Sequence, residues 1–199
     1  MLQPKLGRPR DERLHDAILA TTRELLTSTS YAELSMDSVA IHAGVGKKTL
    51  YRRWPSKAPL VAEAVLDAYG RNGSFPVPNT GDLHSDLRTW LIEHAEFIAQ
   101  PANAALIRAL VAAAAASPLD NEALYQQFSA PQHAGLMTRL RLAVADGRVQ
   151  PDADLSAIAN ALVGTLLLQV LTQSAPTGAP NNHYDGLLQA LLNGVSKPR

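Results

Sequence analysis

The chain has 199 residues, and its 18 basic and 18 acidic side chains give a formal net charge of zero. Hydrophobic residues make up 46% of the chain, which excludes a disordered tail, and the length allows one large domain or two small ones. The absence of cysteine excludes disulfides, thiolate metal sites and a thiol nucleophile. The longest apolar stretch, 157–171, is shorter than the ~20 residues of a membrane helix, and no apolar core follows the basic N-terminus. We therefore expect a cytoplasmic protein without a membrane segment.

The charges are distributed unevenly along the chain. Residues 1–60 hold ten basic and six acidic side chains, a net charge of +4, whereas the rest of the chain has eight basic and twelve acidic ones, a net charge of −4. Five of the ten basic residues lie within 47–57. A basic N-terminal third on an acidic remainder indicates that this third meets a polyanion.

Apolar residues recur at helical spacing and no stretch alternates as a strand would, so we predict an all-α fold. In the N-terminal part, caps and breakers predict helices over 11–27, 36–43, 47–53 and 57–69. Ser35 is the expected N-cap of the second helix, and Gly44 is expected to end it, because glycine adopts a left-handed conformation at low cost. Gly46 opens the third helix and Pro55 ends it.

The remainder of the chain is also predicted to be helical, after a linker-like run over 72–81 rich in glycine and proline. The pattern predicts a loop over 174–182 and helices over 83–98, 103–116, 117–147, 155–173 and 183–195. The helix over 103–116 is apolar on nearly all sides, so we expect it to be buried. Pro131 either kinks the helix over 117–147 or restarts it.

Two short helices joined by Ala43-Gly44-Val45 form a candidate helix-turn-helix. A recognition helix must be short, braced by the helix before it, and rich in small or polar residues that reach base edges. Four apolar residues can supply the brace: Val39, Ala40, Val45 and Leu50. The first turns that would enter the major groove contain Lys47, Lys48, Thr49 and Arg52, while flanking phosphates are within reach of Tyr51, Arg53 and Lys57.

The segment 34–57, which reads LSMDSVAIHAGVGKKTLYRRWPSK, closely resembles the DNA-binding signature of the TetR family of transcriptional regulators. The resemblance lies in the Ala-Gly-Val turn, the Thr-Leu-Tyr of the recognition helix, the aromatic residue after it and the Ser-Lys that opens the next helix. It extends over 11–67, and beyond that it is architectural only. It implies an N-terminal helix-turn-helix DNA-binding domain followed by a helical ligand-binding and dimerisation domain.

The resemblance also implies roles for individual residues. Phosphates would be contacted by Ser35, Tyr51, Arg53 and Lys57, and bases would face Lys47, Lys48 and Thr49; the predicted DNA-binding set is completed by Gly46, Arg52, Arg8 and Arg10. The last two belong to Gly7-Arg8-Pro9-Arg10, which resembles the core of arginine hooks that enter a narrow minor groove, and the alternative is a solvated tail. The implied domains are a head over 1–55, a connecting helix over 56–72 and an effector-binding and dimerisation domain over 73–199.

The body of the chain offers weaker signals. Polar or aromatic residues that interrupt aliphatic faces are possible lining for an effector pocket, although most will be core: Trp90, His94, Phe97, Arg108, Tyr125, Phe128, Met137 and Gln169. Small and apolar residues at helical spacing near the C-terminus predict a four-helix dimer interface, the alternative being burial within one subunit. Its predicted residues are Ala157, Ala161, Gly164, Leu168, Leu188 and Leu191.

Competing chemistry has little support in the sequence. Gly44 to Thr49 departs from a phosphate loop at two positions, no histidines pair at metal-binding spacing, and no hydrolase elbow occurs. We therefore predict no enzyme, no metal and no cofactor. The prediction is a homodimeric, ligand-responsive regulator, in the first instance a repressor, that binds palindromic double-stranded operator DNA and answers to an unidentified small-molecule effector. The alternatives are an activator of the same fold and a helical ligand carrier or scaffold with an incidental basic head.

Overall fold

The computed structural model describes residues 8–69, 76–172 and 184–193, and within these ranges the secondary structure is helical, without a strand. This confirms the all-α prediction. The predicted loop over 174–182 lies outside the described residues. The elements are α1 (Arg8–Ser28), α2 (Met36–His42), α3 (Lys47–Arg53), α4 (Lys57–Tyr69), α5 (Leu83–Ala99), α6 (Pro101–Ala116), α7 (Pro118–Leu124), a π-helical turn (Tyr125–Ser129), α8 (Ala130–Ala145), α9 (Leu155–Thr172) and α10 (Asp185–Asn193).

These helices form two compact units that are interleaved along the chain. The first unit comprises Met1–Asn72 and Pro101–Gln127, and the second comprises Gly73–Gln100 and Phe128–Arg199. The predicted segments 1–55, 56–72 and 73–199 follow chain order, whereas packing groups α6 and α7 with α1 to α4.

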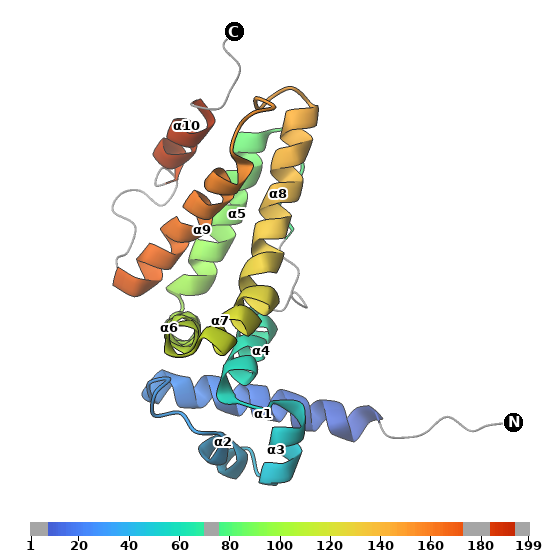
Figure 1. Cartoon of the computed structure of the whole chain (residues 1–199), viewed down its shortest axis with the longest axis vertical. Helices are drawn as coiled ribbons and strands as arrows, with labels where there is room; N and C mark the ends of the chain where they lie inside the picture. Colours follow the sequence, from blue (N-terminus) through green and yellow to red (C-terminus); the bar gives the residue numbers. More distant parts are fainter. Residues whose placement is uncertain (1–7, 70–75, 173–183, 194–199) are drawn as a thin grey trace, which may run out of the picture. The chain divides into compact units, whose positions relative to one another are not determined.

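In the first unit the long helix α1 packs against α2, α4 and α6 (Figure 1). The buried face of α1 is formed by Ile18, Leu19, Thr22 and Leu26. The hydroxyl of the buried Thr22 donates to the carbonyl oxygen of Ile18, so this polar group keeps a hydrogen bond. The burial expected for the helix over 103–116 is only partly correct. Leu106 and Leu110 of α6 are buried, but Ala112 and Ala115 face solvent, because alanine is apolar yet small enough to be left exposed at little cost.

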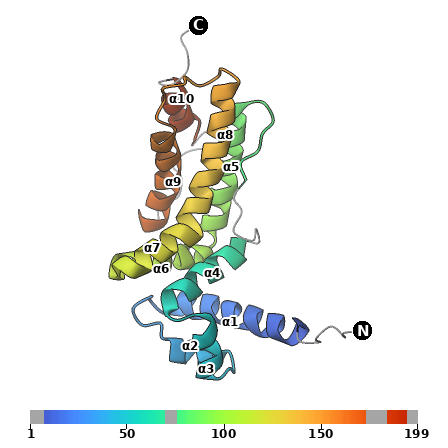
Figure 2. The same ribbon diagram turned by 45° about the vertical axis from the view of Figure 1, so that its right-hand side comes forward.

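In the second unit α5, α8 and α9 lie side by side as a bundle, and α10 packs against α5 (Figures 1 and 2). Its core is built from large side chains that are almost fully buried: Leu87, Trp90, Leu91, Leu136, Leu140, Leu162 and Leu188. Pro131 lies in the first turn of α8, directly after the π-helical turn, and Ser129 at this junction has helical backbone angles, so the chain stays helical from α7 into α8.

The core of the second unit also contains a buried ion pair. Asp86 of α5 and Arg139 of α8 are 1% and 2% exposed, and the Arg139 Nε donates to Asp86 Oδ2 over 2.8 Å, with Nη2 2.7 Å from the same oxygen. The hydroxyl and the backbone N–H of Thr80 donate to Asp86 Oδ1. Burial alone raises the pKa of Asp86, but these Thr80 hydrogen bonds and the guanidinium of Arg139 together hold that pKa below its ordinary value.

Candidate nucleic-acid interface

The turn between α2 and α3 is formed by the residues that the sequence predicted for it. Ser35 is the N-cap of α2, and its hydroxyl oxygen accepts from the backbone N–H of Ser38 over 3.0 Å. Gly44 follows the end of α2 at φ +65°, a conformation that other residues adopt only with strain. The N–H of Val45 then donates to the carbonyl oxygen of Ala40 over 2.9 Å. This closes the helix end and turns the chain into α3.

One side of α3 packs against α2, and the other side is exposed to solvent. Leu50 is fully buried, Val39 and Ala40 of α2 are buried as well, and α2 packs against α3. Gly46, in an extended conformation, is the N-cap of α3, and Trp54 is its C-cap. A seven-residue helix has no stability of its own in water, so this apolar brace holds α3 in place.

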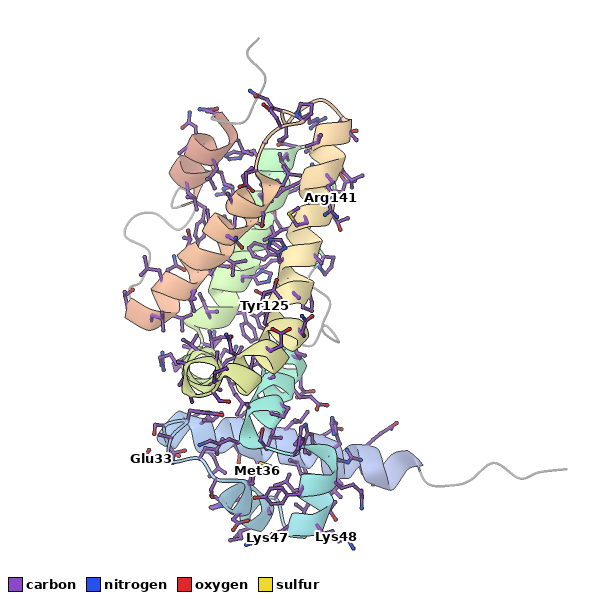
Figure 3. The ribbon with its side chains drawn as sticks, viewed as in Figure 1. Glu33, Met36, Lys47, Lys48, Tyr125 and Arg141 are labelled. Carbon is purple, nitrogen blue, oxygen red and sulfur yellow. The ribbon has the colours of Figure 1, made fainter. Side chains whose placement is uncertain are left out.

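The outer side of α3 is polar and cationic. Figure 3 shows Lys47 and Lys48 at the start of α3 on the side that faces away from α1. Of the predicted DNA-contacting residues described in full, the exposed ones are Ser35, Gly46, Lys47, Lys48, Tyr51 and Arg52, and the half-buried ones are Thr49, Arg53 and Lys57. Residues 8–10 are helical, while the side chains of Arg8 and Arg10 lie outside the described part of the chain.

The two lysines at the start of α3 differ in their surroundings. The ammonium of Lys47 donates to Asp37 Oδ2 of α2 over 2.6 Å, and this hydrogen bond, helped by the carboxylate charge, raises the pKa of Lys47. Within the described residues Lys48 takes part in no ion pair. To bind a base, Lys47 would have to give up its ion pair with Asp37, whereas Lys48 has no ion pair with a described residue to give up.

Lys57 has an unexpected environment at the start of α4. Its ammonium donates to the carbonyl oxygens of Tyr31 over 2.7 Å, Leu34 over 3.0 Å and Ala32 over 3.4 Å, and it lies 4.3 Å from the centre of the Tyr31 ring. An ammonium has three N–H donors, so all three are engaged by the loop between α1 and α2. If Lys57 holds this loop, its replacement should lower the stability of the protein; if it contacts a phosphate, its replacement should change the salt dependence of DNA binding.

We expect Lys57→Met, which keeps the apolar stem and removes the ammonium, to lower the free energy of unfolding by about 2 kcal/mol, because three charge-assisted hydrogen bonds to carbonyls are lost. The dependence of duplex affinity on salt should stay unchanged. Urea unfolding and a salt titration of duplex binding measure the two quantities. A salt slope that flattens by about one unit, with stability intact, would instead show that Lys57 contacts a phosphate.

A second cluster joins α1, the end of α3 and α4. His15 lies between Arg53 and Glu63, and its ring stacks on Trp54 with 5.3 Å between ring centres. Arg53 was predicted from the sequence but its partners were not, because His15 and Arg53 are 38 positions apart and no local pattern relates them. Asp37, the partner of Lys47, was missed for the same reason.

The residues predicted for the body of the protein are dispersed. Trp90 and His94 are buried, and their rings lie 4.0 Å apart between centres with their planes tilted by 32°. Of the other predicted pocket residues, the second unit holds Phe97, Met137 and Gln169 and the first unit holds Arg108 and Tyr125, while the side chain of Phe128 lies outside the described residues.

The residues predicted for the dimer interface divide by exposure. The exposed ones, all on α9, are Ala157, Gly164 and Leu168, while Ala161 and Leu191 are half-buried. Leu188 is fully buried in the core of the second unit, so it has no surface to offer a partner.

Comparison with known proteins agrees with this architecture. Residues 18–64 match the family model for bacterial regulatory proteins of the tetR family, and residues 77–181 match the model for the C-terminal domain of tetracyclin repressor-like proteins. An HTH-type transcriptional regulator of Mycobacterium tuberculosis is 33% identical over 98% of this chain and 90% of its own length. The DNA-binding transcriptional repressor TetR of Mycobacteroides abscessus is 42% identical over 39% of this chain and 40% of its own. The solved structure of the TetR family transcription regulator SCO0332 has a TM-score of 0.68 and 29% identity, covering 92% of this chain and 99% of that one.

A cationic recognition helix in one of two helical units defines a DNA-binding transcriptional regulator of the helix-turn-helix class. The proteins that share this architecture and sequence are regulators of transcription rather than enzymes. The chain belongs to the TetR family.

Proposed function

We propose that the protein is a homodimeric, ligand-responsive transcriptional repressor that binds palindromic operator DNA and is released from it by a small-molecule effector. The observation that supports this most directly is the exposed, cationic start of α3, braced on α2 through the buried Leu50. The 42% identity of the M. abscessus relative over 78 residues, in a protein named as a repressor, favours repression over activation.

Within the proposed complex the roles follow from hydrogen-bonding capacity. Lys47, Lys48 and Thr49 face base edges in the major groove, and Ser35, Tyr51 and Arg53 contact the backbone. Although the Ser35 oxygen already accepts from Ser38, its hydroxyl proton remains available to a phosphate oxygen. Most of the affinity comes from phosphate neutralisation, so log K falls linearly with log salt concentration.

Dimerisation is proposed to use α9, and the occupant of its exposed face is a second copy of the chain. α9 has 18 residues with a mean hydropathy of 1.8, by which measure it alone among the described helices is long and apolar enough to cross a membrane. Leu168 is 60% and Leu171 49% exposed, which leaves large apolar side chains uncovered in the single chain. Gly164, also exposed, allows a partner helix to approach closely.

The effector is proposed to bind in the second unit, where Trp90 and Arg139 have buried hydrogen-bond donors without an acceptor in the described part of the chain. Trp90 is fully buried and Arg139 is 2% exposed, and neither the indole N–H nor Nη1 of the guanidinium has a hydrogen-bond partner among the described residues. Buried donors that remain unpaired are costly. A small apolar molecule with a carbonyl or carboxylate oxygen would satisfy such donors, and this defines the class of effector proposed.

The test of the proposed function is binding to the DNA immediately upstream of the protein's own gene, followed by selection from a randomised duplex library. We expect a palindromic site and a change of preferred base at one position of each half-site for Lys48→Ala, since a base-reading pair discriminates by about 1–3 kcal/mol. The control is Arg148→Ala, which removes the same charge from an exposed position of the second unit.

The two variants separate base reading from general attraction. An Arg148→Ala protein that selects the wild-type site, beside a Lys48→Ala protein that does not, supports the assignment. Identical sites from all three proteins would show that Lys48 reads no base. A wild-type protein that prefers no duplex over random competitor would exclude the function itself.

A further inference from the structure

The imidazole of His15 is held between a cation and an anion. Arg53 Nη1, at the end of the recognition helix α3, lies 2.7 Å from His15 Nδ1, and His15 Nε2 lies 3.0 Å from Glu63 Oε1 of α4. The side chain of His15 is 27% exposed, so both contacts are partly shielded from water. Three helices therefore meet at one ring.

The partners determine which nitrogen of the ring bears the proton. A guanidinium has donors only, so Nδ1 accepts from Arg53 and must be unprotonated. The proton of the neutral ring is then on Nε2, where it donates to the carboxylate of Glu63. An imidazolium would present a proton from Nδ1 to the guanidinium and could not make the contact with Arg53.

The far side of this arrangement is fixed as well. The other oxygen of Glu63 accepts from the indole N–H of Trp54 over 2.6 Å, and the His15 ring stacks on the indole. Trp54 is 3% exposed and is the C-cap of α3. Trp54, at the end of the recognition helix, thus holds both the carboxylate of Glu63 and the imidazole of His15 in place.

We propose that neutral His15 is a positioning residue for Arg53: through Nδ1 it holds the guanidinium in the orientation in which it contacts a DNA phosphate. The proposal rests on the proposed function, since it assigns a partner to one of the backbone-contacting residues. Holding a long side chain in place reduces the entropy that it loses on binding. Protonation of the ring removes this acceptor from Arg53, so operator affinity depends on the charge of His15.

The charged groups around the ring leave Arg53 and Glu63 as its principal partners. On α4, Asp67 pairs with Arg23 of α1, and on α2, Asp37 pairs with Lys47. Of the elements packed against α1, α2 also carries His42 and α6 carries Arg108, and α1 itself carries Glu12 and Asp16 close in sequence to His15.

Three variants test the proposal by duplex affinity as a function of pH and salt. His15→Phe keeps a ring on Trp54 but has no acceptor, and we expect it to weaken binding about five- to tenfold and to flatten the salt slope by about one unit. His15→Asn offers an amide oxygen close to the place of Nδ1 and should restore most of the affinity. His84→Phe, which removes a half-buried histidine of the second unit, is the control and should bind as the wild type does.

The pH profile separates positioning from mere packing. The ratio of the dissociation constants of His15→Phe and the wild type should fall toward one as the pH falls, because an imidazolium already lacks the acceptor. Taking the ratio cancels every effect of pH that the two proteins share. A ratio that is constant with pH would assign His15 to packing and overturn the proposal.

Two further measurements complete the test. In an Arg53→Ala background, His15→Phe should change nothing, and an undiminished loss would overturn the proposal. Nitrogen-15 spectra of the DNA-free protein should show the proton on Nε2, and a proton on Nδ1 would likewise overturn it. If the wild type binds no duplex at all, the proposed function fails, while these spectra still decide whether the hydrogen bonds around His15 exist.

Discussion

Replacing Arg139 by methionine is expected to lower the free energy of unfolding by about 3–5 kcal/mol, because it leaves the carboxylate of Asp86 buried without its counter-charge. Methionine has a similar length, so little volume is lost from the core. Thr80 would still donate two hydrogen bonds to Asp86, but no positive charge would remain beside it. Urea unfolding followed by circular dichroism measures the loss.

The matched control is Arg141→Met on the same helix. Figure 3 shows Arg141 on the side of α8 that faces solvent, and the residue is exposed. Its replacement should change stability by no more than about 0.5 kcal/mol. If the two variants unfolded at the same urea concentration, the buried pair would contribute nothing beyond an ordinary surface charge.

The stability difference between the wild type and Arg139→Met should depend on pH in a defined direction. Since the pKa of Asp86 in the folded state is below its ordinary value, the ionised form stabilises the fold. This contribution is fully present above the ordinary aspartate value of about 3.9 and is lost as the pH falls through the lower folded-state pKa. The unfolded chain contributes equally to both proteins, so their difference should shrink as the pH falls from the higher pKa that Asp86 has without Arg139 toward the lower pKa that it has beside Arg139.

The second large effect is expected for Leu168→Glu. A carboxylate at this exposed position of α9 would have to be buried against the partner helix, so the proposed dimer should dissociate to monomers. Duplex affinity should then fall by roughly 10²-fold or more, because two linked heads no longer bind the two half-sites together. Light scattering gives the mass of the particle, and fluorescence anisotropy gives the affinity.

Leu142→Glu is the control for this substitution. Leu142 is a leucine of α8 that is also exposed, at 43%, and the same charge there should leave both mass and affinity unchanged. A Leu168→Glu protein that remained dimeric would place the interface elsewhere than α9. Dissociation of both variants would mean that the interface extends to α8.

The parts of the fold that could be predicted from the sequence are those with local causes. The Ser35 cap, the left-handed Gly44 and the short helix after Gly46 each depend on neighbours within a few positions, and the structure confirms all three. The membership of α6 in the first unit could not be foreseen, because an apolar helix does not indicate which neighbour it will cover.

The contacts within the candidate site show the same division. Exposure of Lys48 follows from the helical period, but the engagement of Lys57 by three carbonyls depends on how the loop over 29–35 folds back to the start of α4. Charged residues are expected at the surface unless they are paired. Asp86 and Arg139 are 53 positions apart, so no local pattern indicates that they pair. Pairs of this kind are specified by tertiary packing alone.

The interleaving of the two units has a consequence for any attempt to dissect the protein. A fragment that stops at residue 72 lacks α6 and α7, whose leucines, among them Leu106 and Leu110, cover α1 and α4. Such a fragment would expose the apolar surface of α1 and α4 that α6 and α7 cover in the whole protein. It would therefore tend to aggregate instead of binding DNA as an independent domain. Grafting this head onto another sensor therefore requires residues 101–127 to be transplanted along with it, as a second and separate insertion.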